Sequence, residues 1–378
     1  MISLARTIIE PGKTIGIIGG GQLGRMMALA AKEAGFRIAV LEPAEGAPCT
    51  QTADIVIQAP YNDKDALNRL ADVSDVITYE FENIDYEGLK ELMNIAYIPQ
   101  GAELIRITQN RIFEKEAIAG AGVPVAPYRV IKTENDLEQS IAELGLPAVL
   151  KTATGGYDGK GQFVLRETSQ ASEAAALLGH GDCVLEQWIP FEKEISVIIT
   201  RNSEGETTYF PAAENIHVDN ILHESIVPAR ISEQTERAAR EAAEKIAAAL
   251  SLVGTLAVEM FVTRDGSIYI NEVAPRPHNS GHYTIEACGI SQFGQHIRAV
   301  CNWPLKSTSL LKQAVMVNVL GEHVEGVVQA IVHKPEWSVH LYGKDEAKEK
   351  RKMGHVTILT DNLEETLNDI ENSHIWTK

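Results

Sequence analysis

Hydrophobic and polar residues alternate with two different periods in the first hundred residues. Short apolar runs rich in β-branched residues predict strands at residues 15–18, 37–41, 54–58, 75–79 and 96–99. Apolar residues spaced three and four apart predict helices at residues 22–34, 65–70 and 86–93. Strands that alternate with helices indicate a parallel sheet covered by helices. We therefore expect an α/β domain over residues 1–105.

The pattern changes after residue 108. A helix of mixed charge is predicted at residues 109–119, and strands separated by glycine loops follow it. Ser232 is typical of the N-cap of a long helix, predicted at residues 233–250. After residue 304 the composition shifts to strands rich in Val, Ile and His and a final helix at residues 362–370. We therefore expect further domains over residues 106–304 and 305–378.

The composition restricts the kind of function. The chain has 378 residues, with 34 lysines and arginines against 52 aspartates and glutamates, so its formal net charge at pH 7 is −18. A surface this acidic repels phosphate backbones and anionic lipids, which argues against a nucleic-acid or membrane partner. No apolar run approaches the roughly 18 residues that span a bilayer, and the first residues lack an apolar signal core. We expect a cytoplasmic protein.

A G-x-G-x-x-G motif at residues 19–24 lies between a predicted strand and a predicted helix, and Glu42 ends the next strand. In such a loop, backbone amides approach a phosphate at the positive end of the helix, and the acid can bind a ribose hydroxyl. Alone, the motif favours an NAD-dependent oxidoreductase. Two alternatives stay open. The glycines only permit a tight turn, or the loop binds a nucleotide-like substrate.

The segment at residues 151–161 has four glycines and two lysines between two predicted strands. Such a flexible connection can close amides and ammonium groups over a polyphosphate. It is not a Walker A loop, because Gly161 and a strand follow Lys160, where that motif needs Ser or Thr and a helix. An ordinary glycine hairpin is the alternative, but Lys151 at the end of an apolar strand favours an anionic partner.

Two β-rich runs at residues 255–262 and 267–272 are joined through Asp265-Gly266, a preferred two-residue type I′ turn. Positions that pair across this turn sum to 531, as 265 and 266 do, and Glu259 with Glu272 gives the same sum. The two carboxylates should face each other, which is destabilising unless a cation lies between them. With Asn271 adjacent, they suit Mg²⁺ completed by substrate phosphates. Two solvated edge acids are the alternative.

Groups that bind small anions follow this hairpin. Arg276 offers a guanidinium fork for a planar anion such as bicarbonate, and His278 or His282 could transfer protons. Two weaker signals lie elsewhere. A strand at residues 186–189 followed by Glu194 could contact an adenine edge and a ribose diol. The basic cluster at residues 344–352 is most often a solvated surface, but it could equally bind a substrate phosphate.

In combination, the glycine-rich segment after Lys151, residues 186–189 with Glu194, and Glu259 with Asn271-Glu272 resemble the ATP-grasp superfamily. With the glycine loop, the Thr-Tyr-Glu-Phe-Glu-Asn run at residues 78–83, residues 271–282 and the basic cluster, the resemblance narrows to the N5-carboxyaminoimidazole ribonucleotide synthetase family. It implies a mixture of α/β and α+β architecture. The expected parts are a Rossmann-like amino-terminal domain, an ATP-grasp domain with a lid at roughly residues 123–190, a small β-rich carboxy-terminal domain, and a homodimer.

The resemblance also implies roles for single residues. Catalytic roles would fall to Lys151, Tyr157, Arg276 and His278. ATP would contact Arg111, Lys151, Gly156, Tyr157, Asp158, Gly159, Lys160, Gly161, Gln162, Glu186, Gln187, Trp188, Ile189, Glu194, His217, Asn271 and Glu272. Mg²⁺ would be held by Glu259 and Glu272. The aminoimidazole ribonucleotide would contact Gly20, Gln22, Leu23, Glu80 and Asn279, and its phosphate Lys344, Arg351 and Lys352. The spacing of Glu80 and Glu82 lets either one meet the ribose.

The reaction implied is the carboxylation of 5-aminoimidazole ribonucleotide with ATP and bicarbonate, in purine biosynthesis. Bicarbonate attacks the γ-phosphate, and the resulting carboxyphosphate, or carbon dioxide released from it, carboxylates the amine. Both substrates are small molecules. The alternatives are a formate-dependent glycinamide ribonucleotide transformylase, an NAD-dependent oxidoreductase and a nucleotide-binding regulatory subunit.

Overall fold

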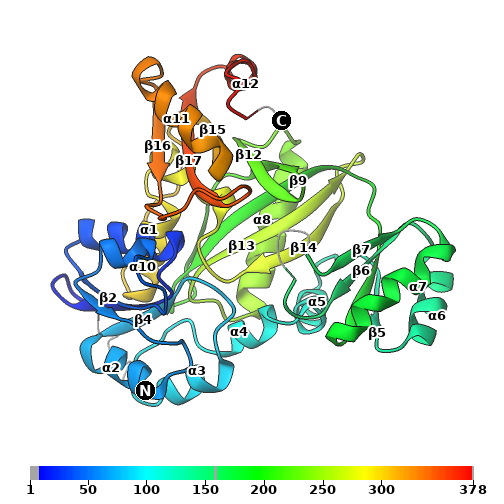
Figure 1. Ribbon diagram of the computed structural model, residues 1–378, viewed down its shortest axis with the longest axis horizontal. Coiled ribbons are helices and arrows are strands. Elements are labelled where there is room, and N and C mark those ends of the chain that lie inside the picture. Colours follow the sequence, from blue (N-terminus) through cyan, green and yellow to red (C-terminus); the bar gives the residue numbers. More distant parts are fainter. Residues whose placement is uncertain (1–7, 157–159, 377–378) are drawn as a thin grey trace.

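The computed structural model describes residues 8–156 and 160–376, which form three groups of elements around one large sheet (Figure 1). The first group is a parallel sheet in the order β3-β2-β1-β4. Its elements are β1 (Thr14–Ile18), α1 (Gln22–Glu33), β2 (Arg37–Leu41), β3 (Ile55–Ile57), α2 (Lys64–Val73), β4 (Val76–Tyr79) and α3 (Tyr86–Leu92). All residues of β1 and β4 are buried, as expected for strands covered on both faces. The predicted α/β order is confirmed.

One predicted strand of this group is absent. Residues 96–99 run beside β4, and the Ile77 amide donates to the Tyr97 carbonyl. The segment forms no ladder beyond that contact and has no strand assignment. Pro99 has no N–H to continue a ladder, and Ile95, which immediately precedes this segment, is 60% exposed.

The second group is a small antiparallel sheet in the order β5-β8-β6-β7. Its elements are β5 (Tyr128–Ile131), α6 (Glu134–Leu144), β6 (Ala148–Thr152), β7 (Gln162–Leu165), α7 (Ala171–Ala174) and β8 (Cys183–Gln187). A capping box between Thr133 and Asp136 starts α6. Helices α6 and α7 cover the outer face of this sheet (Figure 1), so its other face is turned toward the rest of the molecule.

The large sheet has nine strands in the order β14-β13-β9-β11-β12-β15-β17-β16, with β10 paired to β9. Its first strands and their helix are β9 (Phe191–Arg201), β10 (Thr207–Tyr209), β11 (Ala213–Val218), β12 (Ile221–Val227), α8 (Glu233–Ala249), β13 (Gly254–Thr263) and β14 (Ile268–Ala274). Helix α8 is capped by Ser232 as predicted, and it packs its buried alanines on β9 and β13.

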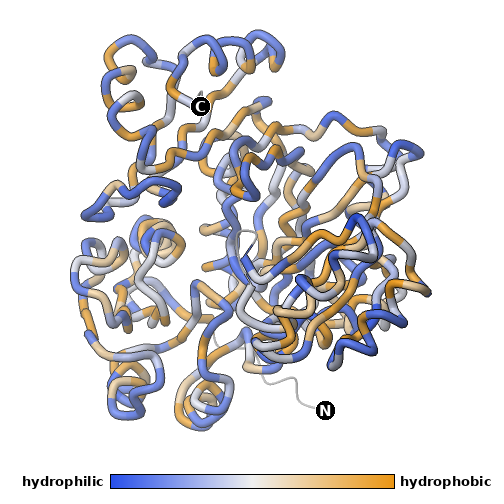
Figure 2. Tube along the Cα trace, turned by 45° about the vertical axis from the view of Figure 1, so that its right-hand side comes forward, coloured by the Kyte–Doolittle hydropathy of each residue, from blue (hydrophilic) through white to orange (hydrophobic). Residues whose placement is uncertain are grey.

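The third group continues the large sheet. After α9 (Thr284–Ala287) and α10 (Gln292–Val300) come β15 (Gln313–Leu320), α11 (Val324–Ala330), β16 (Trp337–Leu341), β17 (Lys352–Thr360) and α12 (Leu363–Asn372). Strand β15 pairs with β12, so the carboxy-terminal strands extend the same sheet. Figure 2 shows hydrophobic residues along these strands and hydrophilic ones on the outer turns.

The helix predicted at residues 109–119 is preceded by a second short helix. The two helices are α4 (Glu103–Thr108) and α5 (Arg111–Gly120). The break falls at Asn110, whose side chain accepts a hydrogen bond from the Ile112 amide and so caps α5. The predicted helix therefore begins two residues late, and α4 was not predicted.

A buried polar network joins the first group to the large sheet. His296 of α10 accepts from the Thr255 amide at Nδ1 and contacts the Thr78 hydroxyl at Nε2, at 3.1 and 2.8 Å. Thr78 donates to Gln100, and the Gln100 amide reaches the Pro275 carbonyl at 3.4 Å. Helix α10 also packs on α1 in a shared apolar core. These contacts fix the segment around residue 275 relative to the parallel sheet.

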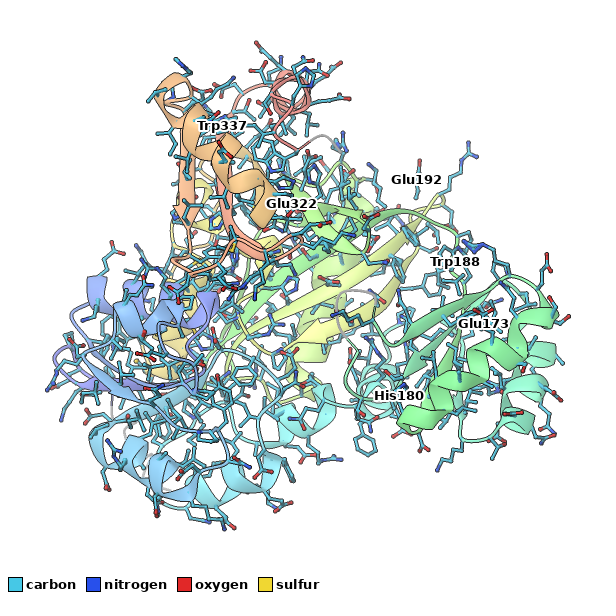
Figure 3. All side chains as sticks on the ribbon, in the orientation of Figure 1. Glu173, His180, Trp188, Glu192, Glu322 and Trp337 are labelled. Atoms are coloured by element: carbon cyan, nitrogen blue, oxygen red, sulfur yellow. The ribbon has the colours of Figure 1, made fainter. Side chains whose placement is uncertain are left out.

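We expect His296 to make the fold acid-sensitive. Burial lowers its pKa to about 3, whereas an imidazole in the unfolded chain titrates near 6.5. Below pH 6.5 only the unfolded state takes up this proton, so stability falls as the pH drops toward 3, by about 2 kcal/mol at pH 5. His296→Gln should lower the thermal midpoint at pH 7.5 but lose less between pH 7.5 and 5 than the unaltered chain. The control is His180→Gln, at an exposed position (Figure 3). Equal acid losses in the unaltered chain and His296→Gln would contradict the prediction.

Candidate functional site

The main cleft lies between the small sheet and the large sheet and has a volume of about 430 Å³. Trp188 stands on the connection between the two sheets (Figure 3). The cleft is lined by most of the residues predicted to contact ATP: Arg111, Lys151, Gly156, Lys160, Gln162, Glu186, Gln187, Trp188, Ile189, Glu194, His217, Asn271 and Glu272. Gly161 is not among the lining residues. Tyr157, Asp158 and Gly159 lie outside the described residues, so the roles predicted for them stay predictions.

The carboxylates of Glu259 and Glu272 face each other across β13 and β14, as predicted, but for a different reason. The turn is a three-residue loop closed by hydrogen bonds between Thr263 and Ser267, with Gly266 at φ +83°. In a regular ladder from that loop, Glu259 would face Asn271. A β-bulge after Ile270 inserts Asn271 as an extra residue and restores the pairing with Glu272.

The bulge also explains why neighbouring side chains share one cavity. In a regular strand Asn271 and Glu272 would point to opposite faces. Here both line the cleft, and the Lys151 ammonium lies 3.4 Å from Asn271 Oδ1. Arg111 Nη1 lies 3.3 Å from Glu272 Oε2. The bulge therefore places an amide and a carboxylate from one strand beside two cations.

Arg111 forms an ion pair with only one of the two facing glutamates, Glu272. Burial, and then the charge of Glu272, raise the pKa of Glu259 to about 7. In the described part of the chain, no group of three or more His, Cys, Asp or Glu side chains could hold a metal ion. A cation at this pair would need further ligands from a bound molecule, which is the coordination typical of Mg²⁺ on a polyphosphate.

A second charged cluster has the opposite sign and reaches the same cleft through Lys151 and Glu186. The buried carboxylate of Glu186 on β8 forms ion pairs at 3.1 Å with both Lys151 on β6 and Lys115 on α5. Lys115 was not predicted, although its spacing of three from Ile112 and Ile118 places it on the buried face of the helix. Two ammonium groups around one carboxylate leave one positive charge, which favours a bound anion.

The remaining ATP candidates surround an aromatic surface. Phe191 and Phe261 stack with ring centroids 4.5 Å apart, and Trp188 lies next to Phe191. Nearby, His217 Nδ1 lies 3.4 Å from Glu194 Oε2. Burial alone would lower the pKa of His217, but Glu194 raises it above its ordinary value. The phenylalanines were missed because each looks like an ordinary strand residue in the sequence.

The segment after β14 brings Arg276 and His278 to the cleft but not His282. Arg276 donates to both oxygens of Glu82, at 2.8 and 3.4 Å. His278 Nδ1 lies 2.9 Å from the Ser280 hydroxyl and accepts from the Ser280 amide, while Nε2 lies 3.4 Å from Glu259. In this arrangement Nε2 carries the hydrogen, so His278 positions Glu259. A role in proton transfer stays a prediction.

His282 does not belong to the predicted anion-binding group. It is 1% exposed and packs between the ring of Phe293 and that of His355. Burial lowers its pKa to about 3, so the imidazole is neutral. The proposal that it could transfer protons in the site is therefore wrong, because its ring is directed into the core.

The glycine loop already has anionic partners from the chain itself. Glu42 accepts from the Gly20 amide at 2.7 Å, and Glu80 accepts from the amides of Gly21 and Gly24. A Cβ on Gly21 would stand 2.7 Å from Glu80 Oε1, so the glycine permits this close approach. Pyrophosphate could not share these amides with two carboxylates, which argues against the NAD interpretation.

The basic cluster packs against the amino-terminal group. Gln51 donates to the Gly343 carbonyl at 2.7 Å, and Lys344 Nζ donates to the Lys352 carbonyl at 2.7 Å. Burial, and then the charge of Arg351, lower the pKa of Lys344 to about 8. Lys352 and Asn279 line the main cleft; Gly20, Gln22, Leu23, Glu80, Lys344 and Arg351 do not. The predicted acceptor residues thus lie in two places, at the cleft and at the glycine loop.

Three family models match successive parts of the chain. They are described as the ribonucleotide synthetase preATP-grasp domain at residues 12–109, the ATP-grasp domain at residues 116–293, and the phosphoribosylaminoimidazole carboxylase C-terminal domain at residues 314–369. In the described part of the chain, no helix is both long enough and apolar enough to cross a membrane.

Curated relatives match along nearly their whole length. An N5-carboxyaminoimidazole ribonucleotide synthase from Bacillus subtilis (strain 168) is 55% identical over 369 residues, which cover 98% of this chain and 97% of the relative. One from Staphylococcus aureus (strain MRSA252) is 46% identical over 360 residues, covering 95% and 96%.

Solved structures agree with these relatives. An ADP complex of an N5-carboxyaminoimidazole ribonucleotide synthetase is 61% identical, with a TM-score of 0.96 and 98% of each chain covered. An N5-carboxyaminoimidazole synthase from Aspergillus clavatus, in complex with ADP and 5-aminoimidazole ribonucleotide, is 32% identical, with a TM-score of 0.89 and coverage of 96% and 97%.

We expect Glu186 to be essential for stability. Glu186→Gln leaves Lys115 and Lys151 buried side by side without a counter-charge, which typically costs about 3–5 kcal/mol. The double variant Lys115→Met/Glu186→Gln should recover part of the loss in thermal midpoint, because one buried ammonium is then removed. Glu173→Gln, at an exposed position on helix α7 (Figure 3), serves as the control. A midpoint for Glu186→Gln equal to that of the control would contradict the charge argument.

Proposed function

The chain belongs to the N5-carboxyaminoimidazole ribonucleotide synthase family, and we propose that it carboxylates the amino group of 5-aminoimidazole ribonucleotide with ATP and bicarbonate in purine biosynthesis. It is an ATP-grasp carboxylating ligase that forms a carbon–nitrogen bond. The observation that carries this function is the pair of opposite charge clusters in one cleft, Lys115–Glu186–Lys151 and Glu259–Glu272. A nucleotide polyphosphate with its cation neutralises both clusters.

ATP occupies the cleft between the two sheets. Lys151, which lines the cleft beside Glu186, binds phosphate oxygens, and Arg111 lines the same cleft in contact with Glu272. The base lies against the aromatic surface of Trp188, Phe191 and Phe261, and Glu194 is placed for the ribose hydroxyls. The small sheet acts as the lid, and its closure excludes water from the phosphates.

Glu259 and Glu272 would hold Mg²⁺ in this proposal, together with the phosphates of the bound nucleotide. The fit rests on the pair itself: the two glutamates face each other across the strands, and burial of Glu259, and then the charge of Glu272, raise the pKa of Glu259 to about 7. When bound, Mg²⁺ neutralises charge on the transferring phosphoryl group. His278 keeps Glu259 oriented through its Nε2 contact.

The reaction needs two displacements. A bicarbonate oxygen attacks the γ-phosphorus, ADP leaves, and carboxyphosphate forms. The amine of the ribonucleotide then bonds to the carboxyl carbon of carboxyphosphate, or of carbon dioxide released from it, as phosphate leaves and the amine loses a proton. Arg276, which lines the same cleft, binds the anion. Lid closure matters because carboxyphosphate hydrolyses readily in water.

The acceptor ribonucleotide lies between the glycine loop and the basic cluster. Gly20, Gln22 and Leu23 approach it from the amino-terminal group, together with Glu80. Lys344, Arg351 and Lys352 bind its phosphate, and Gly343, next to Lys344, accepts a hydrogen bond from Gln51 of the amino-terminal group. Asn279 and Lys352 line the main cleft, which brings the acceptor toward the carboxyl donor. The functional unit in this proposal is a homodimer in the cytoplasm.

Phosphate release tests the function directly. With ATP, Mg²⁺ and bicarbonate, 5-aminoimidazole ribonucleotide should stimulate phosphate release, whereas glycinamide ribonucleotide with formate should not. Lys151→Met should abolish turnover, because the site loses its net positive charge. The variant should stay folded, because Glu186 keeps one partner in Lys115. Turnover only with glycinamide ribonucleotide and formate would move the function to the transformylase. Full activity in folded Lys151→Met would contradict the role of that lysine.

The cation site is tested by binding instead of turnover. Mg²⁺ should tighten ADP binding to the unaltered chain, measured by calorimetry. In Glu272→Gln this tightening should weaken by about tenfold or more, because one charged ligand is lost. Glu192→Gln changes an exposed carboxylate on the large sheet and should bind as the unaltered chain does (Figure 3). The same Mg²⁺ effect in both variants would show that Glu272 is not a ligand.

A further inference from the structure

Glu82 is bound to the guanidinium of Arg276, the group proposed to bind bicarbonate. The guanidinium of Arg276 donates from Nε to Glu82 Oε2 at 2.8 Å and from Nη2 to Oε1 at 3.4 Å. The third nitrogen, Nη1, donates to the Pro277 carbonyl at 3.3 Å. Both side chains are mostly buried, with exposed fractions of 18% and 31%. The side-on fork of Arg276 is thus filled by a carboxylate of the chain itself.

A carboxylate and bicarbonate present the same recognition groups. Both are planar, carry one negative charge, and offer two oxygens at the spacing that a guanidinium fork accepts. Burial alone would raise the pKa of Glu82, but Arg276 lowers it below its ordinary value, so Glu82 is ionised at neutral pH. Two anions cannot use the same pair of N–H groups, and their repulsion is strong in a buried site.

The segment that carries Glu82 also touches the acceptor site. Residues 80–85 connect β4 to α3 without regular structure. Two residues before Glu82, Glu80 binds the amides of Gly21 and Gly24 at the glycine loop. On the other side, the Gln109 amide donates to the carbonyls of Glu82 and Ile84, both at 2.6 Å. A ligand that draws Glu80 away from the glycine loop therefore pulls on Glu82 through one intervening residue, Phe81.

We propose that the Glu82 carboxylate occupies the N–H groups of Arg276 that bind bicarbonate, and that it leaves them when the acceptor ribonucleotide binds at the neighbouring glycine loop. The inference rests on the proposed function and goes beyond it by assigning a residue that makes ATP cleavage depend on the acceptor. Displacement of Glu82 opens Arg276 to bicarbonate only when the amine that consumes carboxyphosphate is present. This order limits the hydrolysis of ATP without product.

A permanent tether is the competing explanation of the same ion pair, and it predicts the opposite sign. If Glu82 only orients Arg276 so that another edge of the guanidinium meets bicarbonate, its removal weakens bicarbonate binding. If Glu82 competes for the fork, its removal strengthens bicarbonate binding. The two explanations are separated by the direction of one measured constant.

The variant that tests this is Glu82→Gln, which keeps the shape of the side chain and removes its charge. We expect the KM for bicarbonate to fall by about tenfold, which is the scale of one charge-assisted hydrogen bond. We also expect bicarbonate-dependent phosphate release without acceptor to rise by a similar factor. The control is Glu103→Gln, which breaks an exposed Glu–Arg pair on α4 and should change neither quantity. An unchanged or raised KM for bicarbonate in Glu82→Gln would overturn the proposal.

A second measurement needs no variant and covers the case in which Glu82→Gln fails to fold. In the unaltered chain, raising the acceptor concentration should lower the KM for bicarbonate, because binding of one ligand frees the site of the other. Independence of the two constants would overturn the proposal. The proposed function is judged separately, by whether the unaltered chain forms the carboxylated product at all. If the product forms but the KM for bicarbonate does not depend on the acceptor, only the proposed role of Glu82 is refuted.

Discussion

Uncompensated buried charge is the constraint on which the cleft depends. Around Glu186 two lysines leave one surplus positive charge, and across β13 and β14 two glutamates face each other with Arg111 paired to only one of them. The cluster around Glu186 cannot relax by exposure to water, since its three side chains are almost fully buried. Such arrangements cost stability in the absence of a ligand, and a polyphosphate with a divalent cation neutralises both at once. The cleft thus selects its ligand by charge as well as by shape.

The fold keeps these clusters in place with few elements. Glu186 is at the end of the small sheet, and β9, which follows it, pairs with β13 and so with the glutamate hairpin. The bulge at Asn271 then turns two successive side chains into the same cavity. The buried network of Thr78, Gln100 and His296 ties the parallel sheet to the segment that carries Arg276. Separate groups of elements therefore contribute to one site with limited freedom to move apart.

The sequence predicts those features that depend on local period and chemistry. The βαβ order, the Ser232 cap and the facing glutamates follow from spacing, and the resemblance supplied the family. Features that depend on tertiary packing could not be predicted. The assumed two-residue turn and the assumed regular strand were both wrong, and their errors of one residue cancelled at Glu272. Lys115 and the phenylalanines gain their meaning only when α5, β9 and β13 meet. From the sequence, His282 was as good a candidate for proton transfer as His278, but the turn at Ser280 directs its ring into the core.

On the acceptor side of the molecule, glutamate carboxylates of the chain itself bind buried N–H donors in three places. Glu42 and Glu80 bind the amides of the glycine loop, and Glu82 binds the guanidinium of Arg276. Each carboxylate satisfies donors that would otherwise be buried without a partner, which is costly. Each also excludes other anions from those donors. A motif that would bind pyrophosphate in a dinucleotide-dependent enzyme is thereby converted into a site for neutral, hydroxyl-bearing groups, because a hydroxyl can donate to a carboxylate that repels phosphate. This explains why a complete G-x-G-x-x-G motif and an acid at the next strand point to the wrong cofactor. The decisive residues, Glu80 and Glu82, lie in the connection after β4, some sixty positions later in the chain.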